Sequence, residues 1–209
     1  MELIENLKWR YATKKFDPNK KISSADIEII KEAVQLSVSS YGLQLYKVLF
    51  VEDKALREQL KPASWGQGQI TDASHLVVFC NYTNIQDEQI DDFVKLVADT
   101  RQQKVEDLQG YGDFVKSKLA EKSDAEKANW TARQTYLALG NLLTACAELK
   151  IDACPMEGFE SETYNEILGL KERGLNAAVV ATIGYRAEDD SSQQAAKVRR
   201  PVEELFEVI

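Results

Sequence analysis

Two hydrophobic periods alternate along this chain, and together they predict a fold of helices and strands. Apolar residues spaced three and four positions apart predict helices, whereas short apolar runs predict strands. Because helices rather than tight hairpin turns separate the strands, the fold class is α+β or α/β. The expected helices are 1–9, 24–36, 54–61, 86–104, 112–122, 125–149 and 161–168, and the expected strands are 45–52, 75–81, 151–154 and 176–184.

Two apolar features indicate burial against something beyond one chain. The helix expected over 125–149 is apolar around most of its circumference, and Gly140 in its middle permits close backbone approach. The chain also ends on four apolar residues within 205–209, after a polar stretch over 186–196. Such an end must be buried, so we expect the tail over 186–209 to pack on a partner subunit.

Composition and charge are those of a globular protein that does not bind polyanions. Apolar residues make up 44 % of the 209 residues and charged residues 29 %, with no repeat or polar linker. We therefore expect one domain over 1–209. The net charge of −8 disfavours nucleic acid and anionic membrane as partners. The apolar runs are too short to cross a bilayer, and the N-terminus is acidic where a secretory signal carries lysines.

Cysteine usage favours a cytoplasmic protein without a metal site. Cys80, Cys146 and Cys154 all lie among apolar neighbours, and their odd count indicates reduced, buried thiols. None of them has a histidine or a second cysteine at metal-ligand spacing.

The chain carries few reactive side chains for hydrolysis or dinucleotide binding. Both of its G-x-G pairs lack the third glycine of the dinucleotide motif, and there is no P-loop lysine motif. The single histidine, His75, follows Asp72 and Ser74, but neighbouring residues on a strand point to opposite faces. We therefore interpret His75 as the start of a buried strand rather than as a catalytic base. A chain like this that still performs chemistry usually borrows a cofactor.

Basic residues cluster near both ends of this acidic chain. Arginine forks grip phosphate through two hydrogen bonds and lysine adds a point charge, so the clusters would form one phosphate site if the two ends meet. The alternative is ordinary solvated surface charge. The clusters consist of Arg10, Lys14 and Lys15 near the start, and of Lys197, Arg199 and Arg200 near the end.

Two further segments have the composition of ligand-binding turns. In residues 155–159 (PMEGF), proline and glycine flank a lone carboxylate, which indicates a sharp loop that can present backbone N–H groups to a ligand. Residues 37–44 (SVSSYGLQ) form a hydroxyl-rich turn, whose serines can bind ring or ribityl oxygens. An ordinary turn is the alternative for both segments.

In this order and at this spacing, the motifs resemble those of the nitroreductase family over nearly the whole chain. Residues 10–16 (RYATKKF) are similar to its N-terminal R-x-S-x-K/R-x-F signature, and residues 72–75 (DASH) to its second strand entry. Residues 39–44 resemble its S-S-x-x-x-Q turn, residues 155–159 its P-x-E-G-F loop, and residues 197–199 its C-terminal K-x-R motif.

The resemblance implies an α+β sandwich in which helices flank a central, mainly antiparallel sheet. It also implies an intertwined homodimer with FMN bound at the subunit interface. The implied cofactor-binding residues are Arg10, Tyr11, Ala12, Lys14, Ser39, Ser40, Gln44, Gln67, Gln69, Pro155, Glu157, Gly158, Lys197 and Arg199.

Each motif has its own role in that arrangement. Reduced flavin gathers negative charge at N1 and O2, which a lysine ammonium stabilises, and hydride arrival at N5 requires no side-chain acid or base. No catalytic side chain is therefore expected. The implied roles are Lys14 near the pyrimidine end, Lys197 and Arg199 at the phosphate, Ser39 and Ser40 from the other subunit, and the backbone N–H groups of Glu157 and Gly158 at the N5/O4 edge.

The sequence departs from the family pattern at two places. Ala12 stands where the family commonly has a phosphate-binding serine, so the basic residues must bind the phosphate without it. Gly66 stands where many members have asparagine, and Gln69 where some have lysine. Gln67 and Gln69 are nevertheless the expected contacts to the pyrimidine edge.

The function implied is an FMN-dependent oxidoreductase with ping-pong kinetics, which takes hydride from NAD(P)H and reduces nitroaromatics, quinones or similar acceptors. Residues 99–124 would form a variable helical cover over the flavin, with Tyr111 and Phe114 as candidate substrate contacts. One alternative is a non-catalytic flavin-binding or dimeric interaction protein on the same scaffold. Another is an unrelated anion-binding α/β protein without flavin.

Overall fold

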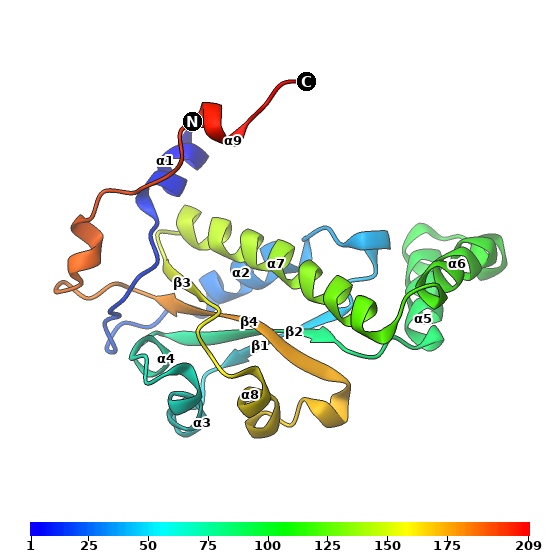
Figure 1. Ribbon diagram of the computed structural model, residues 1–209, viewed down its shortest axis with the longest axis horizontal. Coiled ribbons are helices and arrows are strands. Elements are labelled where there is room, and N and C mark those ends of the chain that lie inside the picture. Colours follow the sequence, from blue (N-terminus) through cyan, green and yellow to red (C-terminus); the bar gives the residue numbers. More distant parts are fainter.

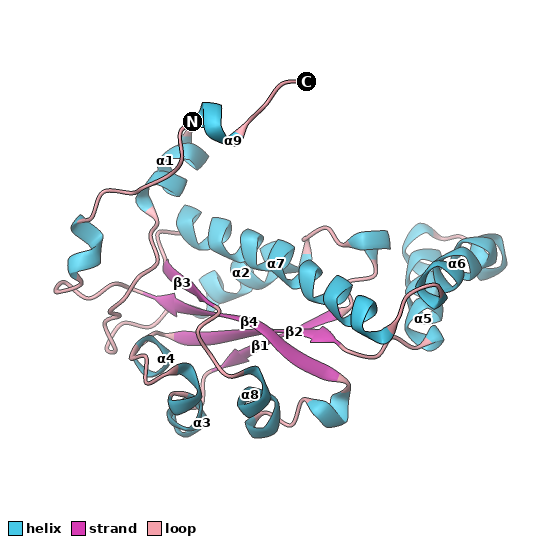
Figure 2. Cartoon of the chain, in the orientation of Figure 1, coloured by secondary structure: helices cyan, strands magenta, loops and turns pink.

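A four-stranded antiparallel sheet lies between two layers of helices in the computed structural model, which describes residues 1–209 (Figures 1 and 2). The strand order is β1-β2-β4-β3, so β2 and β4 occupy the centre. The long apolar runs of the sequence form these two central strands, which are buried on both faces. The strands are β1 (Tyr46–Val51), β2 (His75–Tyr82), β3 (Asp152–Met156) and β4 (Leu175–Gly184).

Alternation along β2 divides the core between the two helical layers. Val77 and Phe79 pack in one cluster with the long helix α7, whereas Leu76, Val78 and Cys80 pack in a second cluster on the other face. Figure 2 shows α2 and α7 over one face of the sheet and α3, α4 and α8 over the other. These helices are α2 (Ser24–Gln35), α3 (Lys54–Leu60), α4 (Gln69–Asp72), α7 (Asp124–Glu148) and α8 (Ser161–Ile167).

Two parts of the chain extend from this body in different directions (Figure 1). The helical pair α5 (Asp87–Arg101) and α6 (Val105–Ala120) forms one extension, with a small apolar core that includes Leu43 and Leu45. At the other end, α1 (Glu2–Trp9) and α9 (Val202–Leu205) bring the two termini near each other.

The expected helix over 112–122 begins earlier than predicted, at Val105. The two glycines of this segment do not interrupt the helix. Gly112 lies where α6 crosses α5, and a Cβ atom added there would come within 3.1 Å of Val94 Cγ2. The glycine therefore permits close helix packing, which outweighs its weak helix propensity.

The strand expected over 151–154 extends further than predicted, because β3 includes Pro155 and Met156. Proline cannot donate a backbone hydrogen bond, but β3 is an edge strand whose only neighbouring strand is β4. The missing N–H group of Pro155 therefore interrupts no hydrogen-bond ladder between strands. Four short 3-10 helices were not predicted: Ser40–Gly42, Pro62–Ser64, Lys171–Arg173 and Ser191–Gln194.

The other expected elements are present to within a few residues, including the helix capped by Ser23, whose hydroxyl accepts a bond from the Asp26 amide. All three cysteines are free and buried, as expected. Burial raises the pKa of both Cys80 and Cys146 to about 12, so these thiols are inert. No helix combines the length and the hydropathy needed to cross a membrane.

Candidate functional site

The two ends of the chain meet at a cavity of about 480 Å³ beside α1. Lys197 lies 190 positions after Leu7 in the sequence. Its ammonium nevertheless donates to the Leu7 carbonyl at 2.6 Å and to the Arg10 carbonyl. Arg10 and Arg199 line the same cavity. The structure therefore joins one residue of the first basic cluster, Arg10, to two of the second, Lys197 and Arg199, whereas Lys14, Lys15 and Arg200 do not line the cavity.

Three of the four cations that line this cavity have no anionic partner, and only Lys8 is paired, with Glu5 at 2.9 Å. No carboxylate oxygen lies within 4.0 Å of the charged groups of Arg10, Lys197 or Arg199. Arg10 Nε is buried without any hydrogen-bond partner, and Arg199 Nη1 donates only to the Val198 carbonyl, at 2.6 Å. A buried donor without a partner costs free energy. These residues consequently fit a phosphate group, which would accept their hydrogen bonds.

Repulsion between the cations in the cavity also indicates a phosphate ligand. Burial and then the charge of Arg199 lower the pKa of Arg10. Burial lowers the pKa of Lys197 as well, with further contributions from the charges of Arg10 and Arg199. A dianion among the three residues would reverse these effects, because opposite charges favour the protonated form.

Asp190 fixes the N-terminal segment that carries these motifs. It is buried, and its Oδ2 accepts bonds from the Tyr11 hydroxyl at 2.9 Å and from the amides of Lys14 and Lys15 at 2.9 and 3.2 Å. Its Oδ1 accepts from the Ser192 amide at 3.0 Å. Burial acts to raise the pKa of Asp190, but these hydrogen bonds outweigh burial and leave the pKa lowered.

We expect Asp190→Asn to lower the free energy of unfolding by about 1.5–3 kcal/mol, because an amide nitrogen cannot accept the bonds that Oδ2 accepts. The lowered pKa means that this stabilisation is complete above the ordinary pKa of aspartate and is lost as the pH falls below it. Urea unfolding at neutral and acidic pH measures both effects. Asp189→Asn is the matched control, since Asp189 pairs only with exposed Lys15. An Asp190→Asn midpoint equal to that of the control would contradict this role.

The loop after β3 lies between α7 and the segment before α4. The Gly158 carbonyl accepts a bond from Gln67 Nε2 at 2.9 Å. A Cβ atom on Gly158 would come within 2.8 Å of the Trp65 ring, so only glycine fits there. The Tyr136 hydroxyl donates to Glu157 Oε1 at 2.7 Å. Burial and then this bond raise the pKa of Tyr136 to about 12.

β3 also aligns the N-terminal segment with this loop. Ala12 and Ala153 form a parallel bridge, which places residues 10–14 along the edge of β3. Burial raises the pKa of the Cys154 thiol, and the charge of Lys14 and a bond from Gln69 act against it. Lys14 and Gln69 therefore both lie close to the strand that leads into the loop.

One chain does not bring the remaining predicted site residues to this cavity. Ser39 Oγ accepts the Gln44 amide at 2.9 Å, and the Ser40 amide donates to Gln134 at 2.8 Å, in the turn between α2 and β1. Tyr111 and Phe114 lie on α6, at the far end of the molecule from the termini (Figure 1). Their neighbour is Tyr41, whose carbonyl accepts from the Tyr111 hydroxyl at 3.1 Å and whose ring packs against the Phe114 ring.

The prediction that Ser74 and His75 point apart is wrong. β2 begins at His75, so Ser74 lies outside the strand, and its Oγ is 3.0 Å from His75 Nδ1. The same Oγ accepts the Ile22 amide at 2.9 Å, and Ser74 is buried. Burial lowers the pKa of His75, which is consistent with its interpretation as a neutral residue at the start of a buried strand.

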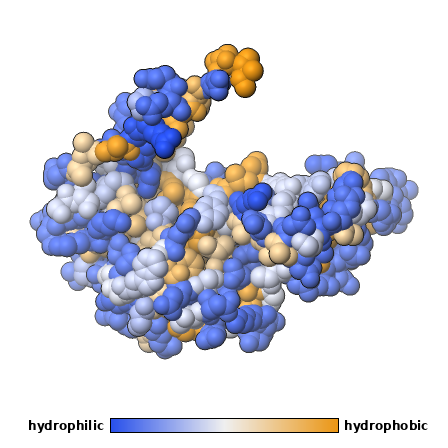
Figure 3. Space-filling model, in the orientation of Figure 1, coloured by the Kyte–Doolittle hydropathy of each residue, from blue (hydrophilic) through white to orange (hydrophobic).

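Several apolar side chains stay exposed in a single chain. The C-terminal residues form an apolar tip that stands off the body in Figure 3. On α7, a Cβ atom added to Gly140 would meet no neighbouring segment of this chain within 4 Å. No part of the same chain therefore packs closely against this glycine. The exposed apolar residues of α1, α7 and the tail are Leu3, Ile4, Leu7, Tyr136, Leu137, Val198, Val202, Leu205, Phe206, Val208 and Ile209.

Comparison with known proteins gives one consistent result. The model of the nitroreductase family matches residues 7–185. "Putative NAD(P)H nitroreductase YfkO" of Bacillus subtilis is 36 % identical over 215 residues, covering 98 % of this chain and 96 % of that protein. The crystal structure of "putative nitroreductase ydfN" from Bacillus subtilis has a TM-score of 0.89 at 22 % identity and covers 100 % of this chain and 99 % of that one. A third such protein, from Exiguobacterium sibiricum and crystallised with FMN, has a TM-score of 0.87 at 17 % identity, covering 100 % and 98 %.

Proposed function

This chain belongs to the nitroreductase family, and from that premise we propose that it is an FMN-dependent oxidoreductase. It takes hydride from NAD(P)H and reduces nitroaromatics, quinones or similar acceptors. The observation that supports this most is the cavity at the termini, where Arg10, Lys197 and Arg199 of an acidic chain share a site without a carboxylate partner. We place the enzyme in the cytoplasm, where free, buried thiols such as those of this chain are usual.

The residues around the cavity divide the binding of FMN between them. Lys197, Arg199 and Arg10 would hold the phosphate through charge-assisted hydrogen bonds. Lys14 would stabilise negative charge on the pyrimidine ring. The loop at Gly158 would present its backbone amides to the ring edge. When bound, FMN supplies the hydride chemistry that the side chains of this chain do not.

The remaining site residues act from a second copy of the chain. Ser39 and Ser40 would reach the flavin of the partner, and the cover over 99–124 would place Tyr111 and Phe114 beside its substrate. The exposed apolar residues of α1, α7 and the tail over 186–209 support a homodimer, because these faces are uncovered in one chain. Donor and acceptor would use the same open side of the site in turn, which gives ping-pong kinetics.

Anaerobic rapid mixing of the purified protein with NADH or NADPH tests this function. We expect the visible flavin absorption to bleach with at least one of the two donors and to return when a quinone is added. A colourless protein that does not bind added FMN would overturn the cofactor assignment. Bound flavin that neither donor bleaches would instead indicate a non-catalytic flavin-binding protein.

A further inference from the structure

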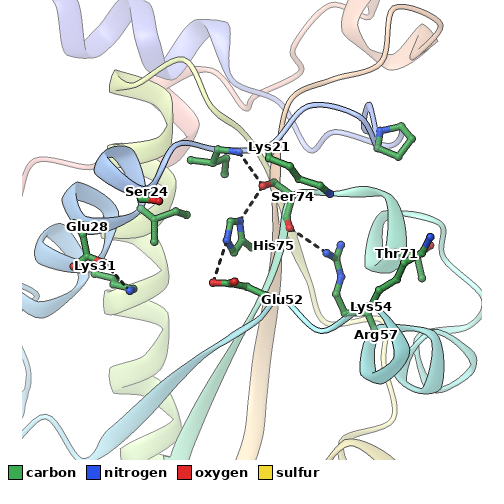
Figure 4. A pocket seen from close by; sticks show the side chains of 13 residues that line it. Lys21, Ser24, Glu28, Lys31, Glu52, Lys54, Arg57, Thr71, Ser74 and His75 are labelled. Carbon is green, nitrogen blue, oxygen red and sulfur yellow. Dashed lines mark hydrogen bonds and ion pairs between the residues drawn. The ribbon is translucent and has the colours of Figure 1, made fainter.

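A second cavity, of about 590 Å³, lies at the start of β2, and none of its lining residues lines the cavity at the termini (Figure 4). Its walls come from the segment before α2, the first turns of α2, the end of β1, α3 and the start of β2. Only two of its 13 lining residues, Ile22 and Ile27, are apolar. The cavity is therefore a polar site rather than a gap in the hydrophobic core.

The acidic side chains gather in one half of this cavity. Glu28 pairs with Lys31 at 2.8 Å, and Glu52 Oε1 lies 3.5 Å from His75 Nε2. The other half is basic and contains Lys21, Lys54 and Arg57. Figure 4 shows Glu28 on α2 at one side, Arg57 on α3 at the other, and Glu52 beside His75 between them.

Arg57 is the most informative residue of the basic half. It is only 3 % exposed, yet no carboxylate oxygen lies within 4.0 Å of its guanidinium. Three of its five N–H groups donate to neutral carbonyls, those of Ile70 and Ala73 at 2.6 Å and that of Ser74 at 3.1 Å. These bonds use three of the five N–H groups, and the charges of Asp72 and Glu58 act on the guanidinium only from beyond 4.0 Å.

Two lysines add to this unpaired charge. Burial lowers the pKa of Lys21, and the charges of Arg57 and then Lys54 lower it further. Neither Lys21 nor Lys54 has a carboxylate oxygen within 4.0 Å of its ammonium. The basic half therefore gathers one buried and two exposed cations, and no carboxylate oxygen lies within 4.0 Å of their charged groups.

We propose that the basic half of this cavity, formed by Lys21, Lys54 and Arg57, binds a phosphate group at a second site separate from the flavin. The ligand is free phosphate or a small phosphomonoester, whose organic part the remaining volume of the cavity can take. A dianion matches three cations better than a carboxylate does, and its oxygens can accept the ammonium and free guanidinium hydrogens together. Binding would link the segment before α2 to α3.

Calorimetric titration of the FMN-loaded protein at constant ionic strength tests this site. Filling the flavin cavity beforehand prevents phosphate from binding there. We expect one inorganic phosphate per chain, and AMP to bind at the same site while adenosine does not. Affinity for AMP above that for phosphate assigns a phosphomonoester, and equal affinity assigns the free ion.

Variants locate the binding. Lys21→Ala and Lys54→Ala should each weaken phosphate binding by about tenfold, the loss expected for one charge-assisted hydrogen bond. Lys47→Ala is the matched control, because Lys47 is an exposed lysine on β1 outside this cavity. FMN occupancy and the thermal midpoint of each variant show that it is folded.

Three results would overturn the proposal. These are absence of saturable phosphate binding, equal binding by Lys21→Ala and Lys47→Ala, and adenosine binding as tightly as AMP. Phosphate binding that is lost in a Lys197→Ala, Arg199→Ala double variant but kept in Lys21→Ala would also overturn it, since the ion would then occupy the flavin cavity. The readout does not depend on NAD(P)H oxidation, so a protein that binds FMN without catalysis gives the same test, and a protein that binds no FMN is titrated as the Lys197→Ala, Arg199→Ala double variant.

Discussion

Replacing Lys197 and Arg199 together with alanine should weaken FMN binding by about 3–6 kcal/mol, which corresponds to a loss of roughly 10²- to 10⁴-fold in affinity. The two side chains reach the cavity at the termini, and neither pairs there with a carboxylate. Their loss removes two charge-assisted hydrogen-bonding partners from the phosphate. Quenching of flavin fluorescence during titration of the apoprotein measures the dissociation constant.

Arg200→Ala is the matched control for this double variant. Arg200 is the next basic residue along the chain, is exposed and does not line the cavity. Its substitution should leave FMN affinity close to that of the unmodified protein. Equal affinities of the double variant and the control would show that the phosphate binds elsewhere.

Replacing Asp152 with alanine should lower the free energy of unfolding by about 3–5 kcal/mol, because it leaves a partly buried arginine without its partner. Asp152 is 4 % exposed, and its Oδ1 accepts from Arg186 Nη2 at 2.6 Å and from Nε at 2.9 Å. The guanidinium lies between two rings, 4.5 Å from the centre of Trp9 and 4.6 Å from that of Tyr11. Chemical unfolding of the flavin-free protein measures the loss without a contribution from ligand binding.

A double variant separates the cost of losing the ion pair from the cost of leaving Arg186 charged without a partner. Asp152→Leu combined with Arg186→Met removes both charges and should cost less than Asp152→Ala alone. If the double variant instead loses, relative to the unmodified protein, the sum of the losses of Asp152→Leu and Arg186→Met measured singly, the two residues do not act as a pair.

The sequence predicts most of the fold because the residues within each element are enough to determine most of its helices and strands. Apolar runs identify the two central strands, and Ser23 marks the start of α2. The errors occur where tertiary contacts outweigh local propensity. The helix expected to begin at Gly112 begins at Val105, because α6 packs against α5 there, and the strand expected to end before Pro155 continues through it, because β3 is an edge.

The candidate site is predictable only in part, for a related reason. Charge against an acidic background identifies Arg10, Lys197 and Arg199, and the structure brings them together. Asp190 escapes notice because it lies in a polar stretch that reads as solvated, although it accepts bonds from the segment that carries Lys14. Nothing in the local pattern connects residues more than 170 positions apart.

Other residues beside the site gave weak signals in the sequence. Trp65 precedes a glycine and stays largely exposed, which is unusual for a tryptophan and becomes informative only once its ring is seen against Gly158. Tyr136 looks like one more apolar residue of α7 until its hydroxyl is seen to donate to Glu157. Contacts of this kind depend on how helices and loops pack, which one sequence does not reveal.

The most direct test of the central claim, that both ends of the chain form one phosphate site for a flavin, compares FMN with riboflavin. The two ligands differ only by the phosphate group, so titration of the flavin-free protein with each isolates the contribution of the cavity. We predict that FMN binds at least about 100-fold more tightly than riboflavin, since only FMN can accept the charge-assisted bonds. Equal affinity for the two ligands would contradict the account, because the cations at the termini would then contribute nothing to flavin binding.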